Sequence, residues 1–206
     1  STAADERFGA ALAASAQWLA VGAPDARRDA AGRGSVYLMP RIDADPPVGA
    51  PLSLTLPELV RGDQFGTALA FSAGTLLVGA RHTPAQRSRR RREREAGGSV
   101  HAFEHDGATW QPVAQWRPGA PQRDRFGERI DADAQAFVTS APRDAGGGSV
   151  YVVERSPGGW SPPLRLVASD APASGAFGID VDLDGATLAV STQRFEVGDF
   201  GQPVTL

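Results

Sequence analysis

The residues with the clearest capacity for chemistry are three carboxylates that alternate along one short segment late in the sequence. Asp180, Asp182 and Asp184 precede Gly185, which is the order in which a calcium-binding loop begins. Position 9 of such a loop would fall on Leu188, and no carboxylate follows where the closing bidentate ligand is needed. We therefore expect a structural turn in this segment, with a calcium site as the disfavoured alternative.

A run of arginines is the second group of chemically capable residues. It contains six arginines within the eight residues 87–94, at Arg87, Arg89, Arg90, Arg91, Arg92 and Arg94. Guanidinium groups bind phosphates, sulfated sugars or an acidic protein surface. The other interpretation, which we favour, is a solvated loop tip, because like charges repel one another. No aromatic residue interleaves the arginines and the formal net charge is −3, so we expect no nucleic-acid partner.

The remaining reactive residue types form no recognisable catalytic or metal-binding pattern. The spacing of His82, His101 and His105 fits no zinc motif. The sequence contains no cysteine and no Gly-x-Ser-x-Gly elbow, and Ser140 and Ser149 have no evident His and Asp partners. We therefore expect neither a catalytic residue nor a cofactor.

The elements that must position these residues belong to a repeat that begins with Phe-Gly. Four such pairs occur at intervals of 57, 61 and 51 residues, at Phe8-Gly9, Phe65-Gly66, Phe126-Gly127 and Phe177-Gly178. A small residue ends a second apolar run thirteen residues after each glycine, at Gly22, Gly79, Ser140 and Ser191. This constant spacing predicts a rigid unit of strand, tight turn and strand. The interval is close to that of a four-stranded propeller blade, about 40–50 residues plus loops.

Each unit continues with further apolar runs that we interpret as strands. A third run follows a glycine, at 34–38, 98–103 and 148–153, with a degenerate copy at 201–206. A fourth run occurs at 52–56, 110–116 and 160–167. No segment of about twelve residues or more shows helical spacing between caps, so the predicted fold is all-β. The units span approximately 1–61, 62–122, 123–173 and 174–206, and the last is incomplete.

The register of the repeat assigns structural roles to several of these residues. Asp184 aligns with Ser15, Ser72 and Asp133, and Ser and Asp both accept a hydrogen bond from a backbone N–H two residues on. This alignment favours the turn over calcium. In each Phe-Gly pair, glycine allows a sharp turn into a crowded innermost strand. The phenylalanine is expected to fill the wedge between adjacent sheets.

The order Phe-Gly, then Gly-Ala-Pro, then Gly-Ser-Val-Tyr resembles the FG-GAP repeat of integrin α-subunit propellers and of many bacterial surface proteins. The resemblance covers essentially the whole chain and is best in the first unit, which has Gly22-Ala23-Pro24. The later units have Gly79-Ala80-Arg81, Ser140-Ala141-Pro142 and Ser191-Thr192-Gln193. The resemblance implies a β-propeller, seven-bladed in the family. FG-GAP propellers often carry calcium in the first hairpin, but in hairpins longer than the turn at Asp184.

From this resemblance we expect a non-catalytic binding or adhesion module of a bacterial extracellular, cell-surface or periplasmic protein, with loops that bind a protein or glycan. The alternative is a propeller that supports a hydrolase or acts as a lectin-like module. Trp110, Trp116 and Trp160 could stack on sugars, although two of them recur at the start of the outer strand, which favours packing. No apolar run approaches the ~18 residues of a membrane span. The chain begins immediately before an innermost strand and ends before the outer strand of the fourth unit, so we expect further blades or a second copy to close the ring.

Overall fold

The computed structural model describes residues 7–26, 32–41, 52–82, 97–117, 124–170, 172 and 175–193. Within these ranges the protein consists of β-strands, turns and bends, which confirms the all-β prediction. The arginine run at 87–94 and the degenerate strand at 201–206 lie outside the described residues. The described part of the chain contains no helix that could span a membrane.

The strands form antiparallel sheets that follow the predicted units. The first sheet contains β1 (Ala11–Ala14), β2 (Trp18–Ala23), β3 (Ser35–Pro40) and β4 (Leu52–Leu54), paired in chain order. The second contains β5 (Phe65–Ser72), β6 (Thr75–Ala80), β7 (Ser99–His105) and β8 (Trp110–Trp116), also paired in chain order. The first two units are therefore four-stranded antiparallel meanders. We call the four repeat copies units 1 to 4.

Unit 3 departs from the four-strand pattern, and two strands of unit 4 fall within the described residues. Unit 3 contains β9 (Ile130–Ala132), β10 (Ala136–Ala141) and β11 (Ser149–Ser156), and both β12 (Gly159–Trp160) and β13 (Leu164–Leu166) pair with β11. The predicted outer strand at 160–167 is thus divided in two, because Pro162 and Pro163 have no N–H to donate to a ladder. In unit 4 the described residues form β14 (Ala176–Asp184) and β15 (Thr187–Gln193).

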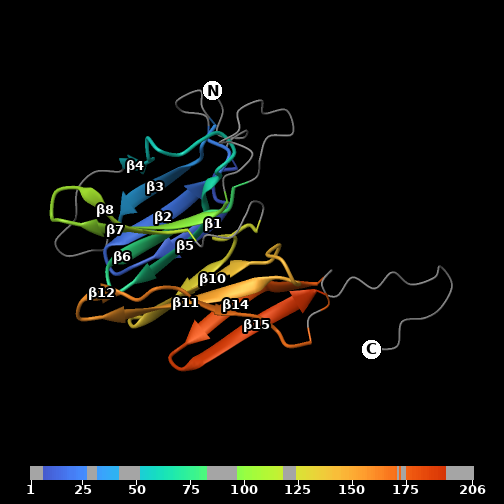
Figure 1. Cartoon of the computed structure of the whole chain (residues 1–206). Helices are drawn as coiled ribbons and strands as arrows, with labels where there is room; N and C mark the ends of the chain where they lie inside the picture. The colour runs from blue at the N-terminus through green and yellow to red at the C-terminus, as the bar shows by residue number, and fades with distance from the viewer. Residues whose placement is uncertain are drawn as a thin grey trace.

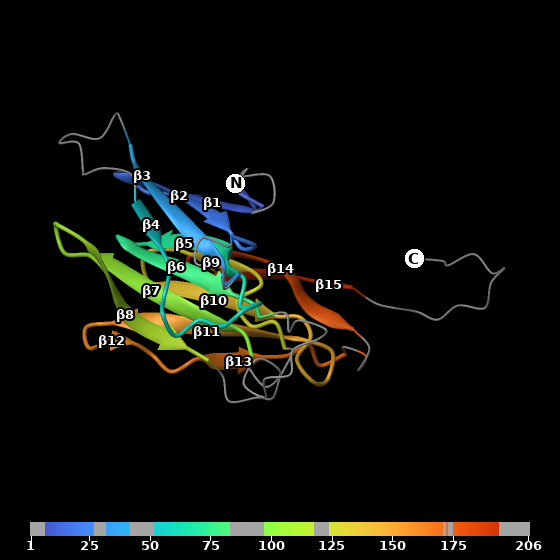
Figure 2. The same ribbon diagram turned by 90° about the horizontal axis from the view of Figure 1, so that it is seen from above.

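The sheets pack face to face in chain order (Figures 1 and 2). Figure 2 shows the strands of units 1 to 3 as successive layers. The first strands of neighbouring units are in contact, because β1 packs against β5, β5 against β9, and β9 against β14. No sheet of the described residues closes on itself. The architecture is therefore a series of sheets whose first strands lie side by side.

The apolar cores lie between the units. The core between units 1 and 2 includes Trp18, Leu38 and Phe65, and the core between units 2 and 3 includes Phe126 and Phe137. Strand β6 contributes to both cores, because Leu76 and Val78 belong to the first and Leu77 to the second. A strand that is buried on both faces reads as a continuous apolar run, which explains its sequence.

Backbone contacts join the units at the Phe-Gly pairs. The φ angles of Gly66, Gly127 and Gly178 are +89°, +84° and +90°, in the left-handed region that favours glycine. A Cβ on Gly22 would lie 2.1 Å from the carbonyl oxygen of Gly66, and one on Gly79 would lie 2.2 Å from that of Gly127. The small residue at the end of each second strand therefore gives the next Phe-Gly pair room to sit against it.

The phenylalanines of the four pairs do not share one environment. Phe65 and Phe126 are fully buried, as expected of residues that fill the wedge between sheets. Phe8 is 49 % exposed and packs edge-on against Tyr37, with 5.2 Å between ring centroids, and Phe177 is only partly buried. Among the described residues no sheet precedes unit 1, so Phe8 has no neighbouring face to pack against.

Candidate functional site

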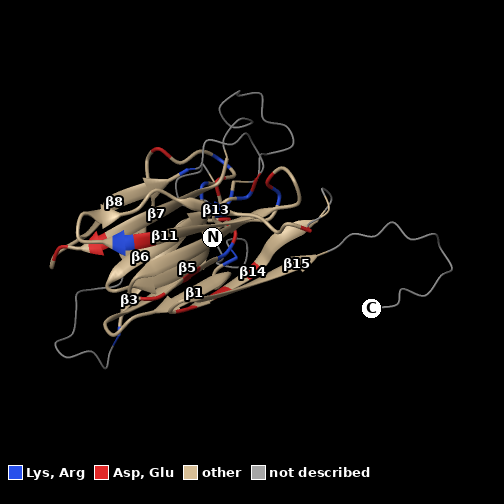
Figure 3. Cartoon of the chain, turned by 60° about the horizontal axis from the view of Figure 1, so that its bottom comes forward, with Lys and Arg blue, Asp and Glu red and all other residues tan. Residues whose placement is uncertain are grey.

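Among the described residues, a group of charged side chains from three units lies where the Phe-Gly pairs are. Each first strand begins at this end of its sheet, and each antiparallel second strand ends there. We call it the Phe-Gly end. Charged residues gather mainly at strand ends and in connections, while most of the strand surface is uncharged (Figure 3). Connections between units and between second and third strands therefore carry most of the polar groups at this end.

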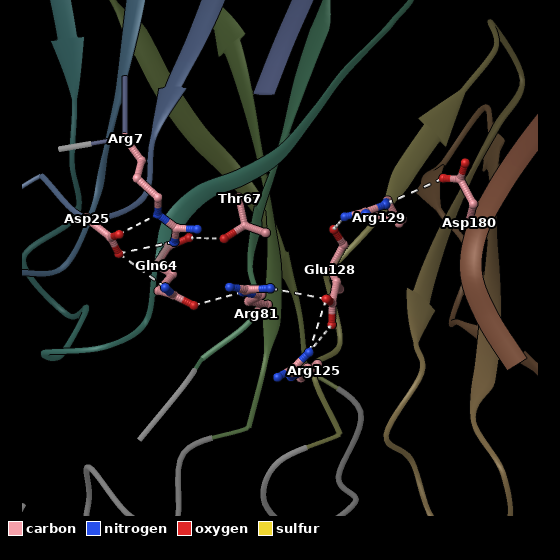
Figure 4. A network of polar contacts seen from close by, with 9 residues as sticks. All are labelled: Arg7, Asp25, Gln64, Thr67, Arg81, Arg125, Glu128, Arg129 and Asp180. Carbon is pink, nitrogen blue, oxygen red and sulfur yellow. Dashed lines mark hydrogen bonds and ion pairs between the residues drawn. The ribbon is translucent and has the colours of Figure 1, made fainter. Parts of the chain in front are cut away.

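Side chains from three units meet at the Phe-Gly end (Figure 4). Arg7 of unit 1 forms an ion pair with Asp25, and its Nη2 donates to Asp25 Oδ1 at 3.2 Å. Gln64 of unit 2 donates from Nε2 to the same Oδ1 at 3.2 Å. Its Oε1 accepts a hydrogen bond from Arg81 Nε at 2.8 Å. Gln64 thus links the arginine of unit 1 to the arginine of unit 2.

The network continues into unit 3 through one carboxylate. Glu128 accepts from Arg81 Nη1 at 3.1 Å, and its two oxygens lie 3.3 and 3.4 Å from Arg125 Nη1. The side chains of Arg81, Glu128 and Arg125 are 20 %, 12 % and 28 % exposed. We call Arg7, Arg81 and Arg125, with Asp25, Gln64 and Glu128, the arginine cluster. Arg129 and Asp180 form a further, exposed pair across units 3 and 4 at 3.5 Å.

The electrostatics of the cluster centre on Arg81. Burial lowers the pKa of the Arg81 guanidinium from its ordinary value because it disfavours the charged form. The charge of Glu128 opposes this shift, while the positive charges of Arg125 and Arg7 add to it. The three guanidiniums are thus close enough to repel one another, and the cluster favours negative charge.

The backbone places these residues by a feature that repeats. Arg7, Gln64 and Arg125 each stand directly before the phenylalanine of a Phe-Gly pair, with φ of +47°, +56° and +58°. Left-handed backbone is uncommon for residues other than glycine and is retained where the surrounding structure determines it. Three polar side chains are therefore presented in the same way by three units. This position was not among the predicted site residues, although its place directly before Phe-Gly is visible in the sequence.

A second repeated position, two residues before the phenylalanine, holds buried aspartates. Asp63 Oδ1 lies 2.6 Å from His82 Nδ1, and Asp63 Oδ2 accepts the N–H of Val60 at 2.7 Å. Asp124 Oδ1 accepts the N–H groups of Gly98 and Phe126 at 3.2 and 3.1 Å. Burial raises the pKa of Asp124, against the lowering effect of these hydrogen bonds. These aspartates thus accept hydrogen bonds from backbone N–H groups at the unit boundary. Their recurrence two residues before Phe-Gly is visible in the sequence and could have predicted this role.

Ser149 and His101, two of the polar residues considered in the sequence, form hydrogen bonds with nearby side chains. Ser149 donates to Asp144 Oδ2 at 2.7 Å, and Arg165 Nε donates to the same oxygen at 2.9 Å. His101 Nε2 lies 2.9 Å from Ser99 Oγ, and burial lowers the pKa of His101 to about 4. The described residues contain no group of three His, Asp or Glu side chains placed to hold a metal ion.

The three alternating carboxylates lie along β14. Asp180, Asp182 and Asp184 are all exposed, and Asp180 is the one that pairs with Arg129. Residues two apart on a strand point to the same face and are separated by about 6–7 Å, so their carboxylates do not converge as a loop would make them. Asp184 also lines a groove of about 670 Å³ between the first hairpins of units 3 and 4, together with Asp133 and Glu154.

The predicted turn role is formed at two of the four aligned positions. Ser15 Oγ accepts the N–H of Gln17 at 3.3 Å, and Asp133 Oδ1 accepts the N–H of Gln135 at 2.7 Å. The N–H of Ala136 also donates to Asp133 Oδ1, at 2.8 Å, and the two hydrogen bonds lower the pKa of the Asp133 carboxyl group. Ser72 departs from the pattern, because its hydroxyl is buried without a hydrogen-bond partner.

The tryptophans are engaged in aromatic packing. Trp110 and Trp116 are 7 % and 8 % exposed. Trp110 packs against Trp18 at 5.6 Å between ring centroids, and Trp116 against Trp160 at 5.8 Å. Trp160 is partly buried and has the guanidinium of Arg155 over its ring at 4.2 Å. Their rings are thus largely covered by neighbouring side chains.

No protein-family model matches the chain, and no curated protein matches its sequence.

Proposed function

We propose that this chain is part of a β-propeller of the FG-GAP type and serves as a non-catalytic binding or adhesion module. We place it in a bacterial extracellular, cell-surface or periplasmic protein. The protein or glycan ligand would be held by the connections at the Phe-Gly end. The arginine cluster carries this proposal, because three successive units present polar side chains at one end from the same repeated backbone position.

The propeller part of the proposal is supported by the way in which the units join. In a propeller the first strands of successive blades are neighbours, and each blade is an antiparallel meander. The contacts of β1 with β5, of β5 with β9 and of β9 with β14 have this order. The exposed Phe8 is a Phe-Gly phenylalanine without a preceding face among the described residues. Further blades of a longer chain, or a second copy, would supply that face.

The binding part is supported by where the charges lie. Surfaces that bind ligands are commonly built from connections that a rigid scaffold holds in place. The segment that joins β6 to β7 leaves the described chain one residue after Arg81, at His82, and contains the six-arginine run. Arg81 and His82, the last described residues before this segment, lie at the Phe-Gly end. The proposal requires no resident metal or cofactor.

A glycan and protein array, probed with the whole chain, tests the proposal. We expect specific binding to a limited set of ligands, together with no turnover of the same glycans in a hydrolase screen. Turnover of any bound glycan by the purified chain would instead favour the hydrolase-associated alternative. Absence of specific binding across both ligand classes would contradict the binding function.

A further inference from the structure

The arginine cluster has more positive than negative charge. Three guanidiniums, those of Arg7, Arg81 and Arg125, are paired with two carboxylates, those of Asp25 and Glu128. Arg7 has Asp25 as its partner, whereas Arg81 and Arg125 share Glu128. One positive charge is therefore left in surplus around Glu128, at a place where burial strengthens electrostatic interactions.

The cluster also has N–H groups available for an anion. A guanidinium carries five N–H donors. Arg81 uses Nε and Nη1, and Arg125 uses Nη1, in the hydrogen bonds that the structure contains. Arg81 Nη2 and Arg125 Nε and Nη2 make no hydrogen bond with any described residue. The two guanidiniums that share Glu128 can thus still donate to an oxyanion such as a carboxylate or a sulfate, which a guanidinium binds through two parallel N–H groups.

The arginines are also arranged as a series. Arg7, Arg81 and Arg125 come from units 1, 2 and 3, and Arg129 adds a half-exposed guanidinium beside unit 4. A ligand that bears one charge per sugar or per disaccharide can contact successive units, so its charges add along the series. The positions in the cluster are all polar, whereas protein ligands gain most affinity from buried aromatic or apolar anchors.

We propose that the arginine cluster binds the carboxylate or sulfate groups of an acidic polysaccharide, with Arg81 and Arg125 as the central contacts and Gln64 as the residue that orients Arg81. This inference rests on the proposed binding function and names its ligand class. Gln64 holds Arg81 Nε, and Glu128 holds one Nη, so the guanidinium plane is fixed before the ligand arrives.

Calorimetric titration of the whole chain tests the assignment with defined probes. The acidic probes are a heparin-derived hexasaccharide and an oligogalacturonate hexamer, which separate sulfate from carboxylate recognition. Maltohexaose serves as the neutral control, and poly-glutamate and single-stranded DNA represent other polyanions. The variants are Arg81→Gln and Arg125→Gln. Arg41→Gln is the matched control, because it removes the same charge from an exposed residue at the opposite end of the sheets, beside Ser15.

We expect at least one acidic hexasaccharide to bind, with an affinity that falls as salt rises. Arg81→Gln and Arg125→Gln should each weaken that binding by at least about tenfold, the loss of charge-assisted hydrogen bonds, and Arg41→Gln by less than about twofold. Glu128→Gln should tighten it several-fold, because it removes the carboxylate that competes for both guanidiniums. A purely structural cluster would not show this gain. Circular dichroism establishes that each variant is folded.

Three outcomes would overturn the assignment. The first is no binding of either acidic hexasaccharide above the maltohexaose control. The second is equal loss of binding in Arg41→Gln and in the two cluster variants. The third is tighter binding of poly-glutamate or single-stranded DNA than of the acidic sugars. If the array then identifies a neutral ligand, the binding function stands and the acidic-polysaccharide assignment falls.

Discussion

Replacement of Gly79 by alanine tests whether close backbone contact between units determines their packing. Gly79 does not have a left-handed φ, so alanine brings no backbone strain of its own. Its Cβ would lie 2.2 Å from the carbonyl oxygen of Gly127, whereas real Cβ atoms essentially never approach closer than 3.0 Å. Units 2 and 3 would therefore have to separate locally by about 1 Å, which loosens a core packed at close to crystal density.

The expected cost follows from overpacking in a well-packed core, about 1–3 kcal/mol. For a chain of this size that corresponds to a fall in melting temperature of about 3–10 °C. Unit 3 shows that a side chain can be accommodated, because Ser140 occupies the equivalent position and lies 3.1 Å from a Cβ built on Gly178. We therefore expect a loosened junction and not an unfolded protein.

Differential scanning calorimetry measures the effect, with Gly158→Ala as the control. Gly158 also lacks a left-handed φ, and nothing lies within 4 Å of a Cβ built on it. The control should melt within about 1 °C of the parent chain, since surface substitutions away from special features change stability little. If Gly79→Ala is as stable as Gly158→Ala, the units are not held at the spacing that the glycine contact requires, and this reasoning fails.

Three further predictions concern other parts of the molecule. Phe65→Ala should lower the free energy of unfolding in urea by about 3–5 kcal/mol and Phe8→Ala by less than about 1 kcal/mol, because Phe65 is fully buried and Phe8 is half exposed; similar losses would contradict this. Burial lowers the pKa of His101 to about 4 from 6.5, so the unfolded chain binds the proton first as pH falls. Stability should be full above about pH 6.5 and decrease toward pH 4 by up to about 3 kcal/mol, and His101→Tyr should flatten a pH series of urea denaturations. Calcium should raise the melting temperature by no more than about 1 °C over a chelator control; a shift of several degrees that Asp182→Asn removes would establish a calcium site.

Much of the fold was predictable because the repeat fixes positions relative to Phe-Gly. The second apolar run that was placed around Gly79 corresponds to β6, and the predicted outer strand at 110–116 coincides with β8. The outer strand of unit 3 was predicted as one run, because apolar residues occur both before and after Pro162 and Pro163. The structure has two strands there, β12 and β13. A pattern of apolar residues indicates which positions are buried, but it does not show whether each residue has the backbone N–H that pairing in a β-sheet requires.

The arginine cluster could not be predicted in the same way. Arg81 stands where two other units have proline, so its charge is visible as a departure from the repeat. That it meets Gln64 and Glu128 depends on how neighbouring sheets pack, which sequence spacing within one unit does not contain. The left-handed conformation of Arg7, Gln64 and Arg125 is also invisible in composition, since none of them is glycine or asparagine.

The apolar cores lie between units, and this limits how the length of the protein can change during evolution. A single unit has no interior of its own, because its apolar residues are shared with the units on either side. Deletion of part of a unit would expose the face of its neighbour. Gain or loss of one whole unit, from one Phe-Gly pair to the next, would instead restore the same junction. Such a molecule can vary its length only in steps of a complete repeat.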